Sequence, residues 1–354
     1  MGHRGDLNSD LAKDKKRDSM SPGRPSKRYL ITGGAGFIGS HLADALVVRG
    51  DSVVLLDNLS TGRTDNIQHL LDGPYEGQVV IQEGSVLDYP LVERLASQVD
   101  VIVHLAASVG VQLIVSKPLE SLVNNVRGTE IVLDAAAKFG PKVLIASTSE
   151  IYGKNAAGPL REDADRVLGS PLKARWAYST SKAVDEIFAY EYWRGRGLPT
   201  VIARLFNCSG PRQTGAYGMV IPRFVRQALA GEDLTIFGDG TQSRCFCHVH
   251  DTVNALIRLL ETERAVGNVF NVGAQNEITI RALGDLVIEM TGSSSGICFV
   301  PYGEAYEPGF EDMERRMPDI SKVRTVTGWQ PTRSLQDIIN DVVEHELEPA
   351  VEVR

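Results

Sequence analysis

The stretch from Arg28 to Gly62 constrains the fold of this chain more than any other part of the sequence. An apolar run over 28–32 leads into three glycines at three-residue spacing, and the pattern then predicts a helix over 37–48 and a second strand over 52–56. The glycines are Gly33, Gly36 and Gly39. In such a unit they permit a sharp turn, a close approach of backbone to a pyrophosphate, and close packing of helix on strand. The unpaired N–H groups of the helix N-terminus would then face the phosphates.

An acidic residue, Asp57, ends the second predicted strand. It lies roughly 20 residues beyond the glycines, where a carboxylate can bind both hydroxyls of an adenosine ribose. A 2′-phosphate at that position would meet like charge, so the pattern predicts an NAD site rather than an NADP site.

Apolar strands and helical patterns alternate along residues 28–205. Strands are predicted over 28–32, 52–56, 79–82, 101–105, 142–146 and 200–205, and long helices over Leu119–Phe139 and Trp176–Arg194. This alternation predicts an α/β fold with a Rossmann-type doubly wound parallel sheet, whose ligands bind at the carboxyl ends of the strands. Beyond Leu205 the pattern loosens and predicts a smaller C-terminal α/β lobe that closes over the cofactor.

The chain is expected to divide into four parts. Residues 1–27 are polar and rich in Ser, Gly and Pro, which predicts a disordered leader. We then expect the NAD-binding domain over 28–205, the second lobe over 206–346, interleaved with the first, and a C-terminal tail over 347–354.

Composition narrows the function classes. The net charge of −8 argues against a nucleic-acid-binding surface. No apolar stretch is long enough to span a membrane, and the N-terminus lacks the apolar core of a signal peptide. The four cysteines show neither a zinc spacing nor a CxxC pair, so we expect no metal site, and reduced thiols in a cytoplasmic protein.

Tyr178 and Lys182 stand four residues apart in a predicted helix and therefore share one of its faces. A surface pair is the ordinary interpretation of this spacing. The helix, however, follows a loop after the predicted strand end at Thr148–Glu150, so its first turn could face the nicotinamide. Because a neighbouring cation favours phenolate, we expect Lys182 to lower the pKa of Tyr178 and Tyr178 to act as a base.

With these motifs the chain resembles the extended short-chain dehydrogenase/reductase family, which includes nucleotide-sugar epimerases, 4,6-dehydratases and decarboxylases. The resemblance covers about residues 28–346 and is carried by the segments Thr32–Gly39, Asn125 with Gly128 and Thr129, Tyr178 with Lys182, Arg204–Asn207 and Gly238–Arg244. It implies NAD as cofactor, a UDP-linked or thymidine-linked sugar as substrate, and a homodimer in which the helices over 119–139 and 176–194 form a four-helix bundle. One departure is Ser85, where relatives usually place an aspartate that binds adenine.

The resemblance and the motifs together predict which residues contact the two ligands. The cofactor-binding residues are expected to be Gly33, Gly36, Phe37, Ile38, Gly39, Asp57, Asn58, Ser60, Thr61, Gly62, Ser85, Val86, Leu105, Ala106, Ala107, Asn125, Ser147, Tyr178 and Lys182. The substrate-binding residues are expected to be Asn207, Val220, Arg244, Asp312 and Arg316.

The triplet Thr148-Ser149-Glu150 separates the reactions of this family. All members first oxidise the sugar at C4, with Tyr178 taking the hydroxyl proton and Thr148 holding the oxygen. The 4,6-dehydratases resemble Thr-Asp-Glu here, and the usual galactose-type epimerases carry small neutral residues. The UDP-glucuronate decarboxylases resemble Thr-Ser-Glu and also carry an arginine before a Pro-Asp pair, which is Arg316 in this chain.

Decarboxylation fits the chemistry of these side chains. Oxidation at C4 of a glucuronate creates a ketone β to the C6 carboxylate, and such β-keto acids lose CO2 readily. Tyr178 and Thr148 would stabilise the enolate as an oxyanion hole does. The predicted catalytic residues are Thr148, Ser149, Glu150, Tyr178, Lys182 and Arg316. The product would be UDP-xylose, or a UDP-4-keto-pentose if the ketone leaves first.

Two alternatives remain open. The stretch Gly303–Arg316 is longer and more acidic than a decarboxylase pattern leads us to expect, and Cys208-Ser209 replaces the usual Thr-Tyr or Thr-Phe. Both departures leave room for a UDP-sugar 4-epimerase acting on glucose or glucuronate. A non-catalytic NAD-binding regulator is the other alternative, although the intact Tyr178 and Lys182 pair opposes it.

Overall fold

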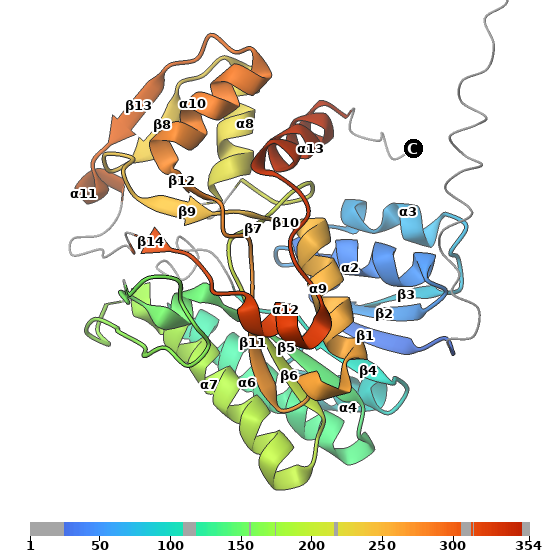
Figure 1. Ribbon diagram of the computed structural model, residues 1–354. Helices are drawn as coiled ribbons and strands as arrows, with labels where there is room; N and C mark the ends of the chain where they lie inside the picture. The colour runs from blue at the N-terminus through green and yellow to red at the C-terminus, as the bar shows by residue number, and fades with distance from the viewer. Residues whose placement is uncertain are drawn as a thin grey trace, which may run out of the picture.

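A seven-stranded sheet forms the centre of the computed structural model, which describes residues 25–108, 118–155, 157–173, 175–215, 219–305, 313 and 315–348 (Figure 1). The strand order is β11-β6-β5-β4-β1-β2-β3, and every neighbouring pair is parallel. The strands are β1 (Arg28–Thr32), β2 (Ser52–Asp57), β3 (Val79–Glu83), β4 (Val101–His104), β5 (Lys142–Thr148), β6 (Thr200–Leu205) and β11 (Asn268–Val272). The predicted doubly wound parallel sheet is therefore confirmed.

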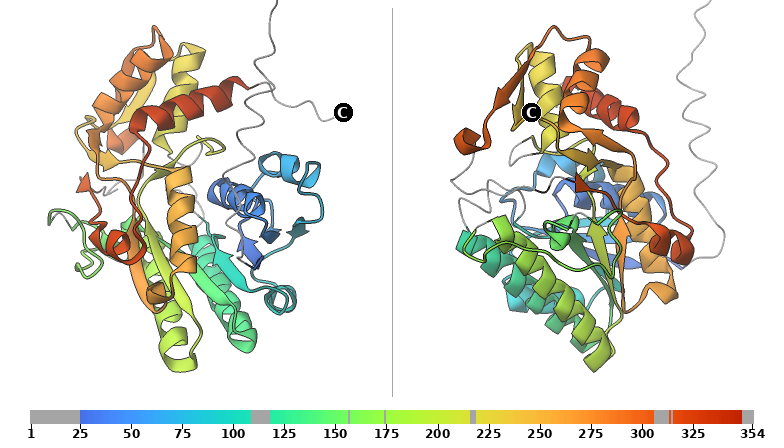
Figure 2. Two further views of the ribbon diagram at one scale, coloured as in Figure 1. Left: turned by 45° about the vertical axis from the view of Figure 1, so that its right-hand side comes forward. Right: turned by 60° about the vertical axis from the view of Figure 1, so that its left-hand side comes forward.

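Helices cover both faces of this sheet (Figures 1 and 2). One face carries α2 (Phe37–Val48) and α9 (Val249–Glu261), and the other carries α4 (Tyr89–Ala96), α6 (Pro118–Phe139) and α7 (Arg175–Arg196). Successive side chains of a strand point to opposite faces, so Leu30 packs into one core and its neighbour Ile31 into the other. Burial on both faces explains why these strands are almost continuously apolar.

The turn after β1 requires glycine at two positions. Gly33 adopts a positive φ of 70°, which L side chains rarely adopt. A Cβ added at Gly39 would overlap the backbone oxygen of Gly33, because α2 passes directly over the turn. The N-terminus of α2 therefore lies close to the end of β1.

The second lobe has a separate core. It is formed by α8 (Val220–Ala230), α10 (Ile280–Thr291) and α13 (Leu335–Leu347), which pack with Phe224, Leu283 and Ile338 at their centre. These helices lie against the parallel strands β8 (Leu234–Phe237) and β13 (Ile297–Val300). The remaining elements are β7 (Cys208–Ser209), β9 (Ser243–Cys245), β10 (Cys247–His248), β12 (Glu277–Thr279), β14 (Arg315–Arg316), α3 (Gln68–Leu71), α11 (Tyr302–Ala305), α12 (Ser321–Thr327), and the 3-10 turns Thr64–Asn66, Ser149–Tyr152 and Glu263–Ala265.

The chain returns to the first sheet after entering the second lobe. The helix α9 packs against α2, and β11 pairs with β6 at the edge of the large sheet. The sequence pattern did not predict β11, because the polar Asn271 interrupts its apolar run. Asn271 is nevertheless buried, accepts a hydrogen bond from the Tyr152 hydroxyl at 2.6 Å and donates to Leu160 O at 2.8 Å.

The strand β5 was expected to end at Ala146, but its pairing with β6 continues through Ser147 and Thr148. Most of the predicted leader, residues 1–24, lies outside the described residues, as does 349–354 of the predicted tail. Within the described part of the chain, no helix combines the length and the apolar character that a membrane crossing needs.

Gly39→Ala should destabilise the fold, because the added Cβ would overlap backbone rather than a flexible side chain. Overpacking of this kind costs about 1–3 kcal/mol. Gly195→Ala is a matched control in α7, where an added Cβ meets nothing within 4 Å, and it should be neutral or slightly stabilising. Urea denaturation measures both free energies of unfolding. Equal values for the two variants would contradict the close approach of α2 to the turn.

Candidate functional site

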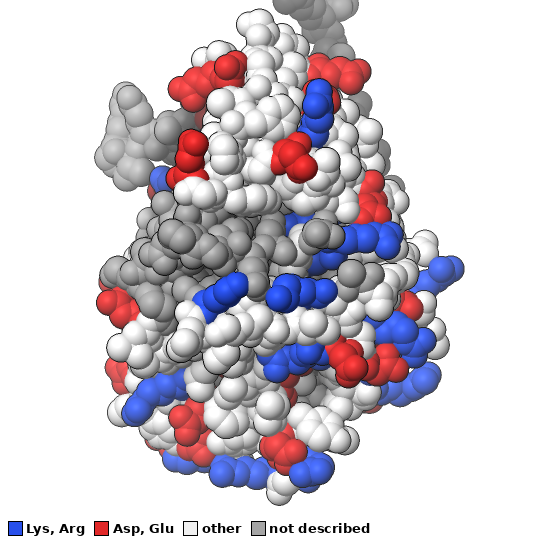
Figure 3. Space-filling model, turned by 90° about the vertical axis from the view of Figure 1, so that its left-hand side faces the viewer, with Lys and Arg blue, Asp and Glu red and all other residues white. Residues whose placement is uncertain are grey.

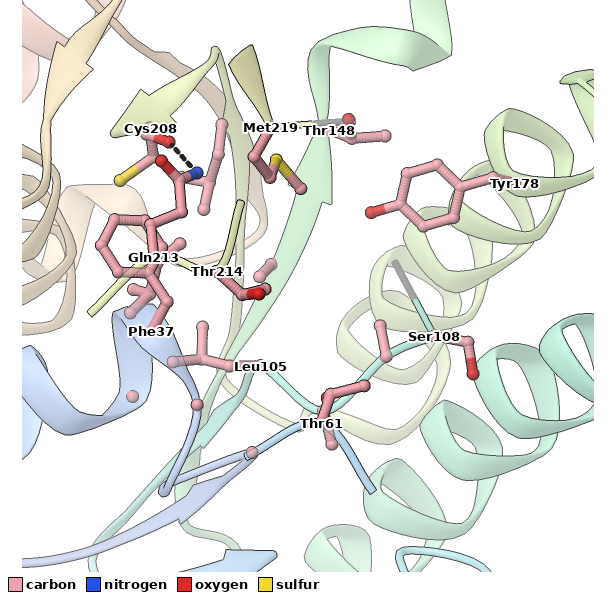
Figure 4. Close-up of a pocket in the computed structure, with 18 of the residues that line it drawn as sticks. Phe37, Thr61, Leu105, Ser108, Thr148, Tyr178, Cys208, Gln213, Thr214 and Met219 are labelled. Atoms are coloured by element: carbon pink, nitrogen blue, oxygen red, sulfur yellow. Dashed lines mark hydrogen bonds between the residues drawn. The ribbon is translucent and has the colours of Figure 1, made fainter. Parts of the chain in front are cut away.

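A large cavity lies between the carboxyl ends of the central strands and the second lobe (Figure 4). Its volume is ≈ 1140 Å³, which exceeds the roughly 300–1,000 Å³ typical of a pocket for one small ligand. The wall on the sheet side comes from the N-terminus of α2 and the ends of the strands, and the opposite wall comes from α8, β8 and β9. The cavity can therefore hold two ligands end to end.

The N-terminus of α2 forms an anion site in this cavity. Gly36 is the N-cap residue, no side chain caps it, and the first turn carries no acidic residue. Gly36, Phe37 and Ile38 all line the cavity. Backbone N–H groups and the positive end of the helix dipole therefore face the cavity, as a pyrophosphate requires.

Asp57 lies beside this anion site and is only 7% exposed. Its carboxylate oxygens accept hydrogen bonds from the backbone N–H groups of Ala35 and Leu59, both at 2.9 Å, and these bonds hold it in one orientation. Gly62 does not line the cavity; it lies behind Asp57, where an added Cβ would come within 2.8 Å of both carboxylate oxygens. A side chain at position 62 would therefore collide with the Asp57 carboxylate, and the cofactor contact of Gly62 stays a prediction.

Two other expected cofactor residues also lie outside the cavity lining. The hydroxyl of Ser85 accepts from the backbone N–H of Leu87 at 3.1 Å, while its neighbours line the cavity. Asn125 is buried and accepts from Ser108 N at 2.7 Å, so it holds the loop that forms the cavity floor. The expected residues that do line the cavity are Gly33, Gly36, Phe37, Ile38, Gly39, Asp57, Asn58, Ser60, Thr61, Val86, Leu105, Ala106, Ala107, Ser147, Tyr178 and Lys182.

All six residues predicted to be catalytic line the same cavity. Thr148 ends β5, and Ser149 and Glu150 follow in the 3-10 turn that Thr148 caps by accepting from Glu150 N at 3.2 Å. Figure 4 shows the hydroxyl of Tyr178 pointing from α7 into the cavity, on the side of Thr148. The strand end and the helix thus present a phenol and a hydroxyl to one substrate position.

Arg316 brings a positive charge to this position from the second lobe. Its Nη1 lies 3.4 Å from Ser149 Oγ and 3.5 Å from Glu150 Oε1. It is carried by β14, which pairs with β9 so that Arg316 stands beside Arg244 in register. A short segment between the two lobes therefore delivers the guanidinium to the end of β5.

The ionisation of Tyr178 differs from the sequence expectation. Desolvation in the cavity wall raises the pKa of Tyr178 above its ordinary value, and the nearby carboxylates of Glu150 and Asp185 raise it further. A hydrogen bond with Thr148 acts in the opposite direction. The expected lowering by Lys182 is wrong for this structure, because the Lys182 ammonium pairs with Asp185 at 3.1 Å.

The far end of the cavity belongs to the second lobe. Asn207, Val220 and Arg244 line it, as expected for substrate-binding residues. Arg244 is largely buried and donates to Ser243 O at 2.8 Å. Asp312, also expected at the substrate, lies outside the described residues.

Sequence reasoning missed several residues of this end. The guanidinium of Arg223 stacks on the ring of Phe237 with 4.5 Å between charge and centroid, and both line the cavity beside Tyr302. Arg212 also lines it and pairs with Asp44 of α2 at 2.7 Å. Nearby, Gln213 donates to Cys208 O at 2.9 Å, the dashed bond of Figure 4. The Gly-Pro-Arg loop at 210–212 was the one signal in the sequence that could have identified Arg212.

The cavity lining is positively charged although the chain is acidic. Its basic members are Arg63, Lys182, Arg212, Arg223, Arg244 and Arg316, and its acidic members are Asp57, Glu120 and Glu150. Figure 3 shows Lys and Arg side chains running across the middle of one face, at the level where the lobes meet, while carboxylates predominate above them. This distribution favours a polyanionic ligand.

A histidine cluster outside the cavity has the spacing of a metal site. The ligand atoms of His248, His250 and Asp341 lie within 4.8 Å of one another. However, His248 Nδ1 accepts the backbone N–H of His250 at 3.0 Å, so the ring proton resides on Nε2, 2.9 Å from Asp341 Oδ2. This leaves His248 without a lone pair for a metal, and we assign the cluster to capping of α9.

Comparison with known proteins places the chain among sugar-nucleotide enzymes. A family model described as GDP-mannose 4,6 dehydratase matches residues 30–342. UDP-N-acetyl-alpha-D-glucosaminuronate decarboxylase of Bacillus cytotoxicus is 41% identical over 319 residues, which cover 90% of this chain and 97% of that protein. UDP-glucuronic acid decarboxylase 1 of Danio rerio is 35% identical over 319 residues, covering 90% of this chain and 72% of that protein.

A solved structure has a fold similar to that of this chain. UDP-glucuronic acid 4-epimerase from Bacillus cereus, in complex with UDP-glucuronic acid and NAD, superposes with a TM-score of 0.79 at 29% identity. The match covers 90% of this chain and 98% of that one. Both lobes therefore have counterparts in that structure.

Proposed function

The chain belongs to the GDP-mannose 4,6 dehydratase family, and we propose that it is an NAD-dependent UDP-glucuronate decarboxylase. The observation that carries this proposal is the position of Arg316, within 3.5 Å of both Ser149 and Glu150 at the end of the cavity where Tyr178 lies. A guanidinium there suits a substrate with a carboxylate at C6. The names of the relatives from Bacillus cytotoxicus and Danio rerio, both decarboxylases of UDP-linked uronates, support it.

The cofactor site fits NAD. Glycine is needed at Gly33 and Gly39 for the turn, the uncapped N-terminus of α2 suits a pyrophosphate, and Asp57 suits the adenosine ribose. When bound, NAD supplies a reversible hydride acceptor for C4 of the sugar. Calorimetry should give tighter binding of NAD than of NADP, since Asp57 would repel a 2′-phosphate, and equal binding would contradict this assignment.

Tyr178 and Thr148 act on the C4 oxygen in this proposal. Tyr178 takes the C4 hydroxyl proton and later returns it, while the Thr148 hydroxyl holds the oxygen in place. The phenol must lose its proton first, and the hydrogen bond with Thr148 favours this loss because it lowers the pKa of Tyr178. Once C4 is a ketone, the two hydroxyl groups stabilise the enolate that forms as CO2 departs.

Arg316 and Glu150 act at C6 and C5 of the sugar, next to C4, and Ser149 lies beside Arg316 there. Arg316 moves away from Glu150 and binds the C6 carboxylate with charge-assisted hydrogen bonds. After CO2 has left, C5 takes up a proton from solvent, and Glu150, freed from its contact with Arg316, relays this proton. Return of hydride would give UDP-xylose, and release before that step would give a UDP-4-keto-pentose.

Two related reactions are the competing candidates. The Bacillus cytotoxicus relative is named for an N-acetylated uronate, so UDP-N-acetylglucosaminuronate is the alternative substrate of the same reaction. The Bacillus cereus structure favours a UDP-glucuronate 4-epimerase as the alternative reaction, since its fold matches over nearly the whole chain. In that enzyme class the keto sugar would keep its carboxylate and take hydride on the other face.

We also propose a homodimer built on α6 and α7, which lie side by side (Figure 1). Apolar side chains stand exposed on both helices, among them Leu119 at 72% and Ile187 at 58%. Light scattering at micromolar concentration should give twice the chain mass, and a monomer mass would contradict the proposal.

A cytoplasmic location stays a prediction, for which cell fractionation is the test.

Tyr178→Phe should lower turnover by about 10²–10⁴-fold, the contribution of a general base. The variant keeps the ring and removes only the hydroxyl, so UDP binding should be unchanged. Steady-state rates and calorimetry with UDP measure the two quantities. If the variant retained more than a tenth of the wild-type rate, another group would be the base.

Arg316→Ala should weaken binding of UDP-glucuronate far more than binding of UDP-glucose, because only the first offers a carboxylate. Arg315→Ala is the matched control, because Arg315 pairs with Glu277 at 2.8 Å and does not line the cavity. Competitive inhibition constants for both sugars measure the selectivity. An equal loss for the two sugars in Arg316→Ala would remove Arg316 from carboxylate binding and favour a neutral-sugar epimerase.

Glu150→Gln keeps the size of the side chain and removes its charge. It should slow formation of the UDP-pentose product, which needs a proton at C5 after CO2 has left, while C4 oxidation survives, so the absorbance of reduced nicotinamide should accumulate in single-turnover measurements. Loss of that absorbance together with CO2 release would place Glu150 in the oxidation step instead.

A further inference from the structure

A buried carboxylate, Asp185, lies in α7 next to the proposed catalytic residues but does not line the cavity. It is 0% exposed, and its Oδ2 lies 3.1 Å from Nζ of Lys182, which is itself 3% exposed. A buried ion pair of this kind adds little net stability, since the cost of desolvating both charges offsets their attraction. Asp185 therefore calls for an explanation other than stability.

The hydrogen bonding of Asp185 is incomplete. Lys182 and the hydroxyl of Thr129 both approach the carboxylate, yet neither gives it a hydrogen bond of good geometry. Nearly all buried polar groups in native proteins have such a bond, and those without one often serve a function. Burial raises the pKa of Asp185, but the Lys182 ammonium favours the carboxylate, so what Asp185 brings to this position is its negative charge.

A line of polar side chains leads from Asp185 to the cavity floor. Thr129 of α6 lies next to Asp185, and its Oγ1 is 3.1 Å from Nε2 of His104. His104 Nδ1 is 2.7 Å from Oγ1 of Thr32, and that oxygen accepts from Ala106 N at 3.2 Å. Ala106 lines the cavity. The line thus crosses α6, β4 and β1 beneath the cofactor site.

The direction of these bonds follows from the charge of Asp185. A carboxylate only accepts, so the Thr129 hydroxyl turns its proton toward Asp185, and its oxygen then accepts from His104 Nε2–H. The neutral His104 ring accepts at Nδ1 from the Thr32 hydroxyl, whose oxygen is left to accept from Ala106 N. His104 is neutral because burial, and then Lys182, lower its pKa to about 3. Every donor in the line therefore points toward Asp185.

The other charged groups around this position are already engaged. Glu186, next in α7, accepts hydrogen bonds from Nε and Nη2 of Arg204, both at 2.8 Å, and one from the hydroxyl of Ser147. On the cavity side, Glu150 is near Arg316. Asp185 is thus the carboxylate that compensates Lys182, and it faces Tyr178 along the same helix.

We infer that Asp185 is a positioning residue for Lys182: it holds the ammonium away from Tyr178 and offsets its charge, and so controls how readily Tyr178 releases its proton. This inference rests on the proposed function, because it concerns the base of that reaction. It adds a residue outside the cavity to the groups that govern catalysis.

The test is the pH dependence of kcat/KM for the wild-type holoenzyme and for Asp185→Asn. Removing the negative charge should favour the phenolate, because the remaining charge of Lys182 attracts it. Turnover rises with pH as Tyr178 deprotonates. The rising limb of the pH profile on its acid side should therefore move to lower pH by about one unit, which is the smaller end of the pKa changes that a neighbouring charge causes. An unmoved limb, or a limb at higher pH, would overturn the inference.

Two controls separate charge from packing. Thr129→Val removes the neighbouring hydroxyl but keeps the Asp185 charge, so it should not move the limb to lower pH. Asp134→Asn removes a carboxylate of α6 that pairs at 3.0 Å with Arg196, at the opposite end of α7 from Tyr178. This variant should leave the pH profile unchanged. A shift to lower pH in either control as large as in Asp185→Asn would overturn the inference. If Asp185→Asn does not fold, Asp185→Ser carries the same prediction.

A second readout does not depend on turnover. Tyrosinate absorbance of the holoenzyme, titrated with pH and compared with Tyr178→Phe, measures the ionisation of Tyr178 directly, and Asp185→Asn should shift it to lower pH. An unshifted titration would overturn the inference even if the enzyme is active. If the wild type turns over no UDP-sugar, the proposed function fails, and this titration still decides the role of Asp185.

Discussion

The buried ion pair between Glu186 and Arg204 is the interaction on which the geometry of the site depends. Both guanidinium contacts measure 2.8 Å, and they tie α7 to β6 in the sheet. Ser147 of β5 donates to the same carboxylate at 2.5 Å, so three elements meet at one charged group. Two planar groups joined in this way allow little rotation of α7. Tyr178, two turns earlier on that helix, is thereby held on the side of Thr148, the residue that follows Ser147.

A second constraint joins the two lobes. The segment 315–319 leaves the second lobe at β14, and Leu160 N donates to Met317 O at 2.8 Å where it reaches the first. Asn271 of β11 bonds both Leu160 O and Asp319 O. Arg316 lies between these anchors, so its approach to Ser149 and Glu150 is fixed from both sides. The proposed decarboxylation uses this arrangement, because the carboxylate and C4 of the sugar must be held by different lobes at once.

Much of the first lobe could be predicted from the sequence, since buried parallel strands are apolar throughout and the glycine turn has few alternatives. The same reasoning placed Thr148, Tyr178 and Arg316 in one cavity. It failed at β11, where Asn271 looks like a loop residue until its buried partners are known, and at Arg223, whose stacking on Phe237 joins residues from two elements. It also failed for the pKa of Tyr178. The sequence shows the spacing between Tyr178 and Lys182. The pairing of Lys182 with a carboxylate and the burial of the phenol are known only from the folded chain.

The central claim is that the site removes the C6 carboxylate of a UDP-linked glucuronate. The most direct measurement incubates the purified protein with NAD and UDP-glucuronate labelled with ¹³C at C6, and follows labelled CO2 and the mass of the nucleotide sugar together. The account predicts one labelled CO2 for each substrate consumed and a UDP-pentose that has lost the label. Conversion to an isomer of unchanged mass, with no labelled CO2, would contradict it and identify an epimerase.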